Sequence, residues 1–166
     1  VCALRWDHID LDNGTMRIVG AVARHQGKLT VTELKSKTSR RMIHLDDSTM
    51  DLLRCHRANL AEYRLSIGTT YEDNYLAFAS PRGRLLDPNV LTKTWQQVCQ
   101  EAGVKFRLHG LRHANASTLI EAGTHIKTVQ TRLGHSSPSL TMAAYAHVSP
   151  SMDKDAADAF ASAMSE

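Results

Sequence analysis

The chain has 166 residues, of which 42% are hydrophobic, so it can bury one ordinary core without help from disulfides. Its three cysteines are odd in number and form no CxxC pair, which argues against a disulfide framework and against a zinc ribbon. No apolar run approaches the roughly 20 residues that cross a bilayer, and no signal-peptide pattern is present at the N-terminus. These features exclude the membrane-spanning and disulfide-rich classes and favour a reducing, cytoplasmic environment.

The formal net charge is +3, and it is unevenly distributed. The last sixteen residues, 151–166, contain four acidic residues and one lysine, so they carry −3 and the first 150 residues carry +6. A charge of this size permits a polyanionic partner but does not identify one, because many unrelated enzymes are equally basic. The positions of the basic residues therefore matter more than their total.

The first 45 residues show the patterns of β-strands. Asn13-Gly14, between apolar residues on both sides, predicts a two-residue hairpin turn, with strand alternation continuing to about Arg24. Gln26-Gly27 predicts the next turn, after which residues 29–34 alternate as a strand. A further extended run over 42–45 completes a small antiparallel three-stranded sheet.

A basic turn separates the last two of these strands. It contains four cations within seven residues, interleaved with hydroxyl side chains: Lys35, Lys37, Arg40 and Arg41. One interpretation is a solvated hairpin tip. The other is a tip at which cations and hydroxyls contact the phosphates of a nucleic acid.

The middle of the chain predicts two helices and a short strand. Asp46 or Asp47 can cap a helix that runs to about Leu65, and Asp87-Pro88 starts a second helix that ends at Gly103. Between the two helices, residues 75–79 are predicted to form a short buried strand.

The remaining residues predict only helices. The first begins at His109 and ends at Gly123, and its inward face is predicted from its apolar and small residues: Leu111, Ala114, Thr118 and Ala122. A short helix over 126–133 ends at Gly134, and another starts at Ser137-Pro138. Residues 151–164 predict a terminal amphipathic helix. The fold class is therefore α+β and mainly helical, with a small antiparallel three-stranded sheet near the N-terminus packed against a helical bundle.

The segment from His109 to Tyr145 gathers an unusual set of side chains within 37 residues: His109, Arg112, His113, His135 and Tyr145. An arginine binds two oxygens of an anion with its planar fork, and histidines transfer protons near neutral pH. A tyrosine can act as a covalent nucleophile. This combination favours phosphodiester chemistry on a nucleic acid.

Other interpretations of these residues remain open. His109 and His113 have the i, i+4 spacing of the zinc histidines of metalloproteases, but position 110 is Gly where that motif needs a Glu base. His135 follows a helix stop and can simply cap the preceding carbonyls. Tyr145, beside two alanines, can be an ordinary core residue.

Taken together, the motifs resemble the catalytic domain of tyrosine recombinases, in particular the integrases of phages and integrative elements. His109-Gly110-Leu111-Arg112-His113 resembles the His-x-x-Arg box of that family, and Leu133-Gly134-His135 resembles its third-histidine box. Tyr145 stands ten residues later, at a usual distance for the nucleophile. Residues 35–45 resemble the lysine hairpin, with Lys37 at the position of the catalytic lysine. The resemblance covers nearly the whole chain.

The resemblance implies DNA strand cleavage by Tyr145 through a 3′-phosphotyrosyl link, followed by religation, without cofactor or metal. Arg112 would bind the scissile phosphate and His135 would donate a hydrogen bond to it. His109 would assist the loss of the tyrosine proton, and Lys37 would protonate the leaving 5′-oxygen. His113 would be structural. The other cations of the basic turn would contact DNA: Lys35, Arg40 and Arg41.

Two departures from the family pattern indicate a fragment. The first catalytic arginine of the family would fall shortly before Val1, and the DNA-clamping N-terminal domain is absent. We therefore expect residues 1–150 to be an N-terminally truncated catalytic domain, and 151–166 to be a C-terminal helix that packs on a neighbouring protomer. The chain starting at Val1 is expected to cleave DNA barely or not at all.

The family also implies partners and a location. The full-length protein would act on double-stranded attachment sites as a homo-tetramer, with accessory directionality or DNA-bending proteins. It would be bacterial or phage-encoded and associated with the nucleoid. Integrase and dimer resolvase are not distinguished by the sequence. The alternatives are a non-catalytic DNA-binding remnant of a recombinase and a metal-dependent hydrolase.

Overall fold

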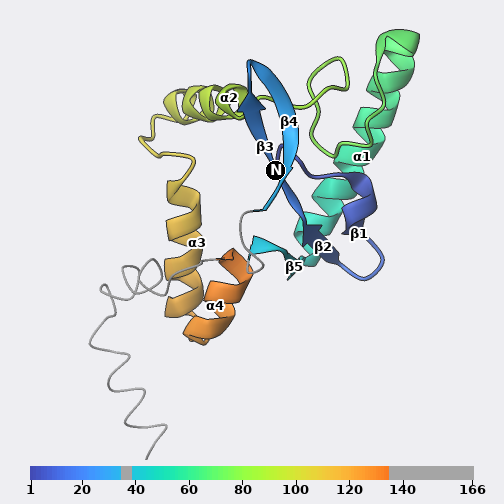
Figure 1. The fold of residues 1–166 in the computed structure, drawn as a ribbon. Helices are drawn as coiled ribbons and strands as arrows, with labels where there is room; N and C mark the ends of the chain where they lie inside the picture. Colours follow the sequence, from blue (N-terminus) through green and yellow to red (C-terminus); the bar gives the residue numbers. More distant parts are fainter. Residues whose placement is uncertain (35–38, 135–166) are drawn as a thin grey trace, which may run out of the picture. The chain divides into compact units, whose positions relative to one another are not determined.

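The computed structural model describes residues 1–34 and 39–134. The chain divides into two compact units, the first from Val1 to Leu108 and the second from His109 onward. Among the described residues, the first unit contains the strands and two long helices, and the second contains a pair of shorter helices (Figure 1).

A three-stranded antiparallel sheet lies in the first unit. Strand β2 (Thr15–Ile18) is central and pairs with β1 (Ile9–Asp10) on one side and β5 (Arg41–His44) on the other. Met16 of β2 stands opposite Ile43 of β5, which puts their side chains on the same face. A small three-stranded antiparallel sheet near the N-terminus is confirmed, but the predicted strand over 29–34 is not part of it.

The turn between β1 and β2 is longer than predicted. Four residues, 11–14, connect the paired strands, so the predicted two-residue turn is wrong. The carboxylate of Asp10 accepts hydrogen bonds from the backbone N–H groups of Asp12 and Asn13 and from the Asn13 amide. This local network closes the longer turn, and only Gly14 in it has a positive φ.

A separate two-stranded sheet, which we call the β3–β4 hairpin, follows (blue arrows in Figure 1). It consists of β3 (Gly20–His25) and β4 (Lys28–Glu33). The predicted turn at Gln26 and Gly27 is confirmed, because both residues have positive φ and so form the two-residue turn that matches strand twist. The predicted continuous strand to Arg24 is interrupted at Val19, where the chain passes from one sheet to the other.

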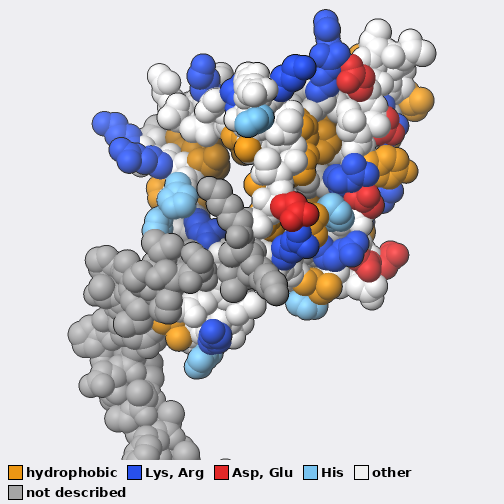
Figure 2. All heavy atoms as spheres, in the orientation of Figure 1, with side chains coloured by type: hydrophobic (Ala, Val, Ile, Leu, Met, Phe, Trp, Pro, Cys, Tyr) orange, Lys and Arg blue, Asp and Glu red, His pale blue; other side chains and the backbone are white. Residues whose placement is uncertain are grey.

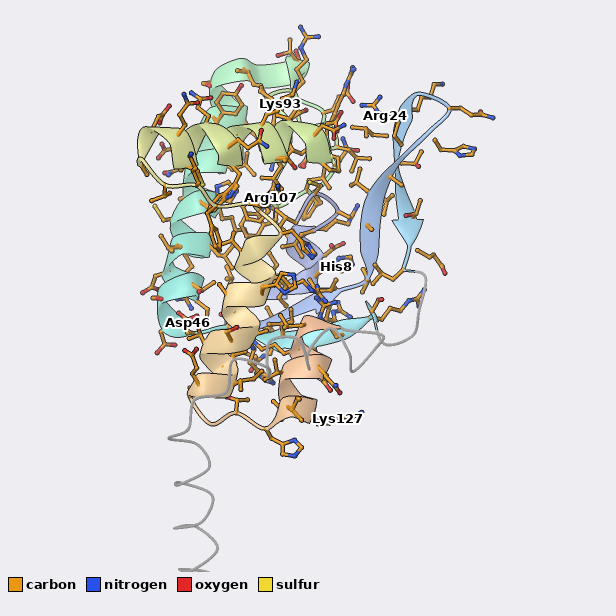
Figure 3. All side chains as sticks on the ribbon, turned by 90° about the vertical axis from the view of Figure 1, so that its left-hand side faces the viewer. His8, Arg24, Asp46, Lys93, Arg107 and Lys127 are labelled. Carbon is orange, nitrogen blue, oxygen red and sulfur yellow. The ribbon has the colours of Figure 1, made fainter. Side chains whose placement is uncertain are left out.

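Two long helices complete the first unit: α1 (Asp47–Ile67) and α2 (Pro88–Glu101). Asp46, labelled in Figure 3, caps α1, and Asp87 caps α2. Each carboxylate accepts a hydrogen bond from a backbone N–H two or three residues further on. Both predicted helix starts are confirmed.

The predicted strand over 75–79 is wrong, and its predicted burial is confirmed only in part, because Tyr75 is exposed. Leu76 and Ala77 are buried. However, Leu76 forms an isolated bridge with Arg5, and Ala79 forms another with Leu85. The two ends of the segment pair with different parts of the chain, so no continuous ladder forms.

Two glycines in the first unit offer a matched test of packing. Gly83 (φ +79°) and Gly27 (φ +80°) share a left-handed conformation, but a Cβ on Gly83 would lie 2.0 Å from the carbonyl oxygen of Glu72, whereas nothing lies within 4 Å at Gly27. We expect Gly27→Ala to lower the free energy of unfolding by about 1–2 kcal/mol, from backbone strain alone. Gly83→Ala should cost at least about twice as much, because the backbone of residue 72 must also move. Chemical denaturation of both variants checks this, and equal losses would contradict the close approach.

The second unit is built on α3 (Gly110–Glu121) and α4 (Ile126–Leu133). Its buried cluster is formed by four side chains from the two helices: Ala116, Ile120, Val129 and Leu133. The predicted start and end of both helices are confirmed. The predicted inward face of α3 is wrong, because Ala116 and Ile120 are the α3 residues buried in the cluster with α4, whereas Leu111, Ala114 and Thr118 are exposed. The eight residues of α4 extend for only about 12 Å and cannot cover the whole of α3.

The remaining predictions for this part of the chain lie outside the described residues. They include the helix from Ser137 that carries Tyr145 and the terminal helix over 151–164. None of the helices described is both long and apolar enough to cross a membrane.

Candidate functional site

The first turn of α3 brings together His109, Arg112 and His113, as the spacing predicted. His109 occupies the N-cap position, and Arg112 and His113 follow within the helix. The two imidazole rings meet edge to face, with centroids 5.2 Å apart and planes at 78°. Both histidines are exposed. Arg112, which lies between them in the sequence, is half-buried.

Arg112 has a defined partner on the neighbouring helix. Its Nη2 donates a hydrogen bond to the carbonyl oxygen of Leu133, at 2.6 Å. Leu133 is the last residue of α4, and carbonyls at this end of a helix lack intrahelical partners and carry partial negative charge. Burial lowers the pKa of Arg112 from its ordinary value, but an arginine in a protein remains charged. The bond to Leu133 therefore orients the planar fork of a charged guanidinium.

The packing of the unit supports this contact. The side chain of Leu133 is 9% exposed and belongs to the α3–α4 cluster, while its carbonyl accepts from Arg112. Gly134 then ends α4 in the left-handed conformation. The residue after it is His135, which lies outside the described residues, as does Tyr145. The contact thus joins the His-x-x-Arg segment to Leu133, the first residue of the predicted third-histidine box.

The first unit contains the described part of the basic turn. Arg40 forms an ion pair of 3.0 Å with Glu33, and both side chains are largely exposed. Arg41 lies in β5 and donates to the carbonyl of Ser39, at 2.9 Å. Exposed ion pairs contribute about 0–1 kcal/mol, so the pair with Glu33 leaves Arg40 able to exchange its partner for a phosphate. Lys35 and Lys37 lie outside the described residues.

One ion pair of the first unit was missed by the sequence analysis. Arg24 in β3 donates to the carboxylate of Asp87 from Nη2, at 2.5 Å, and to the carbonyl of Gly27 from Nη1, at 2.7 Å. Figure 3 labels Arg24 at the turn end of the hairpin. Hydrogen bonds from the backbone N–H of Asn89 and then from Arg24 hold the pKa of Asp87 below its ordinary value. The pattern around Asp87 predicted only a helix cap, because the partner is 63 residues away.

The described residues supply no ligand set for the metal-site interpretation. Within residues 1–34 and 39–134, no three side chains among His, Cys, Asp and Glu gather to hold a metal ion. His109 and His113 are therefore a pair of imidazoles without a described third ligand. Figure 2 shows Lys and Arg side chains spread over the visible face with Asp and Glu among them.

Relatives among characterised proteins are similar over most of the chain. A tyrosine recombinase XerC-like protein of Caldanaerobacter subterraneus is 30% identical over 93% of this chain and 43% of its own length. An integrase of Saccharopolyspora erythraea is 33% identical over 81% of this chain and 31% of its own length. The chain thus spans less than half the length of these relatives.

Solved structures share the fold. The integrase of transposon Tn1549, in complex with transposon right end DNA, matches 96% of this chain and 53% of its own with a TM-score of 0.72 at 20% identity. The XerA recombinase matches 93% of this chain and 49% of its own with a TM-score of 0.65 at 23% identity. These matches confirm the expected mainly helical α+β fold.

The family model covers the segments that carry the recombinase-like motifs. The model of the phage integrase family matches residues 1–152, which include the basic turn, the first turn of α3 and the segment through Tyr145. The chain therefore belongs to the phage integrase family.

Proposed function

We propose that the protein carries out site-specific DNA recombination by strand cleavage and religation through a 3′-phosphotyrosyl intermediate. The observation that carries the proposal is the hydrogen bond from Arg112 to the carbonyl of Leu133. It holds an anion-binding guanidinium at the end of α4, two residues before His135 in the sequence. Family membership and relatives named as recombinases and integrases support the same activity.

The proposed reaction needs no external energy source. The hydroxyl oxygen of Tyr145 attacks the scissile phosphorus, its proton passes to His109, and the bond to the 5′-oxygen breaks. Lys37 donates the proton that the departing oxygen needs. Charge grows on the nonbridging oxygens during this step, and Arg112 stabilises it through paired hydrogen bonds, with His135 as a further donor. Attack by another 5′-hydroxyl on the phosphotyrosyl bond reverses the sequence and joins a new strand.

The proposed substrate is double-stranded DNA that carries recombination sites. The solved Tn1549 integrase is a complex with transposon right end DNA, and the solved XerH recombinase is bound to its palindromic difH substrate. The first 150 residues of this chain carry +6. Lys35, Arg40 and Arg41 would contact the phosphate backbone, which positions a protein without reading the sequence.

The assembly and the location complete the proposal. The full-length protein would act as a tetramer. Its catalytic domain would end near residue 150, and residues 151–166 would pack on the neighbouring protomer. Directionality or DNA-bending proteins would assist it. A protein that acts on chromosomal DNA in this way would work in the cytoplasm, associated with the nucleoid.

A nicked suicide substrate tests the proposed function directly. With the full-length protein that carries this chain, the short cleaved piece diffuses away, and the covalent protein–DNA adduct accumulates and is visible on a denaturing gel. Binding to DNA without any adduct would favour the non-catalytic remnant.

Adduct formation should be unaffected by EDTA, because the proposed charge stabilisation comes from side chains and no step requires a metal ion. The same substrate is incubated with and without the chelator, and MgCl₂ is restored in a third sample as a control. Loss of the adduct in EDTA and its return with metal would support the metal-dependent alternative instead.

A further inference from the structure

The β3–β4 hairpin is poorly supported by packing within the first unit. A hollow of about 590 Å³ lies beside it, lined on the apolar side by Leu29 and Val31 of the hairpin and by Leu76 and Leu85 of the body. Val31 remains 56% exposed. A two-stranded hairpin without a packed face is only marginally stable in water, so contacts other than packing must hold it.

Two ion pairs secure the hairpin at its opposite ends. At the turn, Arg24 bridges the carbonyl of Gly27 and the carboxylate of Asp87, the N-cap of α2. At the base, Glu33 pairs with Arg40. The Asp87 side chain is 21% exposed, compared with 87% for Glu33, so the pair at the turn is the better shielded one. Arg24 is thus the link between the hairpin turn and a long helix of the body.

We propose that Arg24 and Asp87 form a positioning pair that holds the β3–β4 hairpin for delivery of the Lys37 proton to the leaving 5′-oxygen. Strand β4 ends at Glu33, and the chain reaches Lys37 four residues later. A hairpin that swings about its base also changes the orientation of the end of β4, from which the sequence continues to Lys37. The inference rests on the proposed function, which assigns Lys37 as the acid.

A substrate in which sulfur replaces the leaving 5′-oxygen reveals a defect in proton delivery. In the normal reaction, the Tyr145 oxygen forms a bond to phosphorus, the bond from phosphorus to the 5′-oxygen breaks, and that oxygen takes a proton from the lysine ammonium. With a 5′-bridging sulfur, the leaving group is a thiolate, whose conjugate acid has a pKa of about 8.5, so it departs without a proton. A variant whose only defect is a misplaced acid is therefore slow on oxygen and normal on sulfur.

Two variants of the full-length protein break the pair from either side: Arg24→Gln and Asp87→Asn. Asparagine is as good an N-cap as aspartate, so the second variant keeps the start of α2 intact. The two changes alter the net charge in opposite directions. We expect both to slow single-turnover cleavage of the oxygen substrate by about 3- to 5-fold, the scale set by an exposed ion pair. Both should match the parent protein on the sulfur substrate.

Two further variants serve as the positive and the negative control for this measurement. Lys37→Ala should slow oxygen cleavage by about 10²–10⁴-fold, as expected for loss of a general acid, and sulfur should restore most of that loss. Arg84→Gln breaks an ion pair of the same N–O distance, 2.5 Å, between Arg84 and Glu72. Arg84 lines the same hollow but does not belong to the hairpin. This variant should cleave both substrates at the parent rate.

The outcomes separate the two levels of the proposal. If the sulfur substrate does not restore the cleavage rate of Lys37→Ala, Lys37 is not the acid, and the proposed positioning pair is overturned as well. If Lys37→Ala is restored but the two pair variants cleave oxygen at the parent rate, or are equally slow on both substrates, only the positioning pair is overturned. Opposite effects of Arg24→Gln and Asp87→Asn would mean that bulk charge, rather than placement of the hairpin, controls the rate.

Discussion

Tyr145→Phe in the full-length protein is expected to abolish the covalent protein–DNA adduct while DNA binding is retained. Phenylalanine keeps the ring but lacks the hydroxyl oxygen that forms the bond to phosphorus, so no residual route through this residue exists. The suicide-substrate assay measures the adduct, and an electrophoretic mobility shift measures binding.

Tyr63→Phe is the matched control for this change. The hydroxyl of Tyr63 donates to the carbonyl of Pro81 at 3.1 Å, and its side chain is 42% exposed. Removing it deletes one surface hydrogen bond, and adduct formation should stay at the parent level. An adduct in Tyr145→Phe would place the nucleophile elsewhere and would remove the main argument for the proposed mechanism.

Arg112→Ala is expected to slow cleavage by about 10³–10⁵-fold, the range for arginines that stabilise a transferring phosphoryl group. This corresponds to about 4–7 kcal/mol of the activation barrier. Arg112→Lys keeps the positive charge but loses the planar fork, so it should fall between alanine and the parent protein. Single-turnover cleavage at saturating protein measures both.

A structural contribution of Arg112 can be separated from its catalytic one. The hydrogen bond to Leu133 also supports the end of α4, so its loss should loosen the α3–α4 unit. Amide hydrogen exchange in residues 126–134 reports that loosening without reference to the reaction. Faster exchange in Arg112→Ala together with a cleavage rate within about tenfold of the parent would show that the arginine serves only the fold.

Local signals account for the elements that were predicted correctly. Asp46 and Asp87 cap their helices through hydrogen bonds to backbone groups two or three residues away, and Gly134 ends α4 through its own backbone angles. The first turn of α3 likewise places His109 and Arg112 on one face, because residues three apart are neighbours on any helix. Such interactions involve residues near in sequence and are visible in the sequence pattern.

Apart from the turn at Asn13-Gly14, which the nearby carboxylate of Asp10 lengthens, the incorrect predictions concern partners far apart in the chain. The strand over 75–79 failed because its ends pair with different segments, and the break at Val19 separates two sheets whose pairing is nonlocal. The inward face of α3 depends on the side of the helix against which α4 packs. Apolar spacing in a single helix does not contain that information, because packing against a partner selects the face.

The sequence alone determined the helix limits, the turn at Gln26, the chemical character of the site and the family to which its motifs belong. Only the tertiary structure decided that Arg112 binds the carbonyl of Leu133, 21 residues away, and that Arg24 binds Asp87, 63 residues away. Capping and turn preferences are set by a few neighbouring residues, whereas these two contacts exist only once separate elements have packed. The guanidinium that the site requires was therefore predictable, but the atoms that orient it were not.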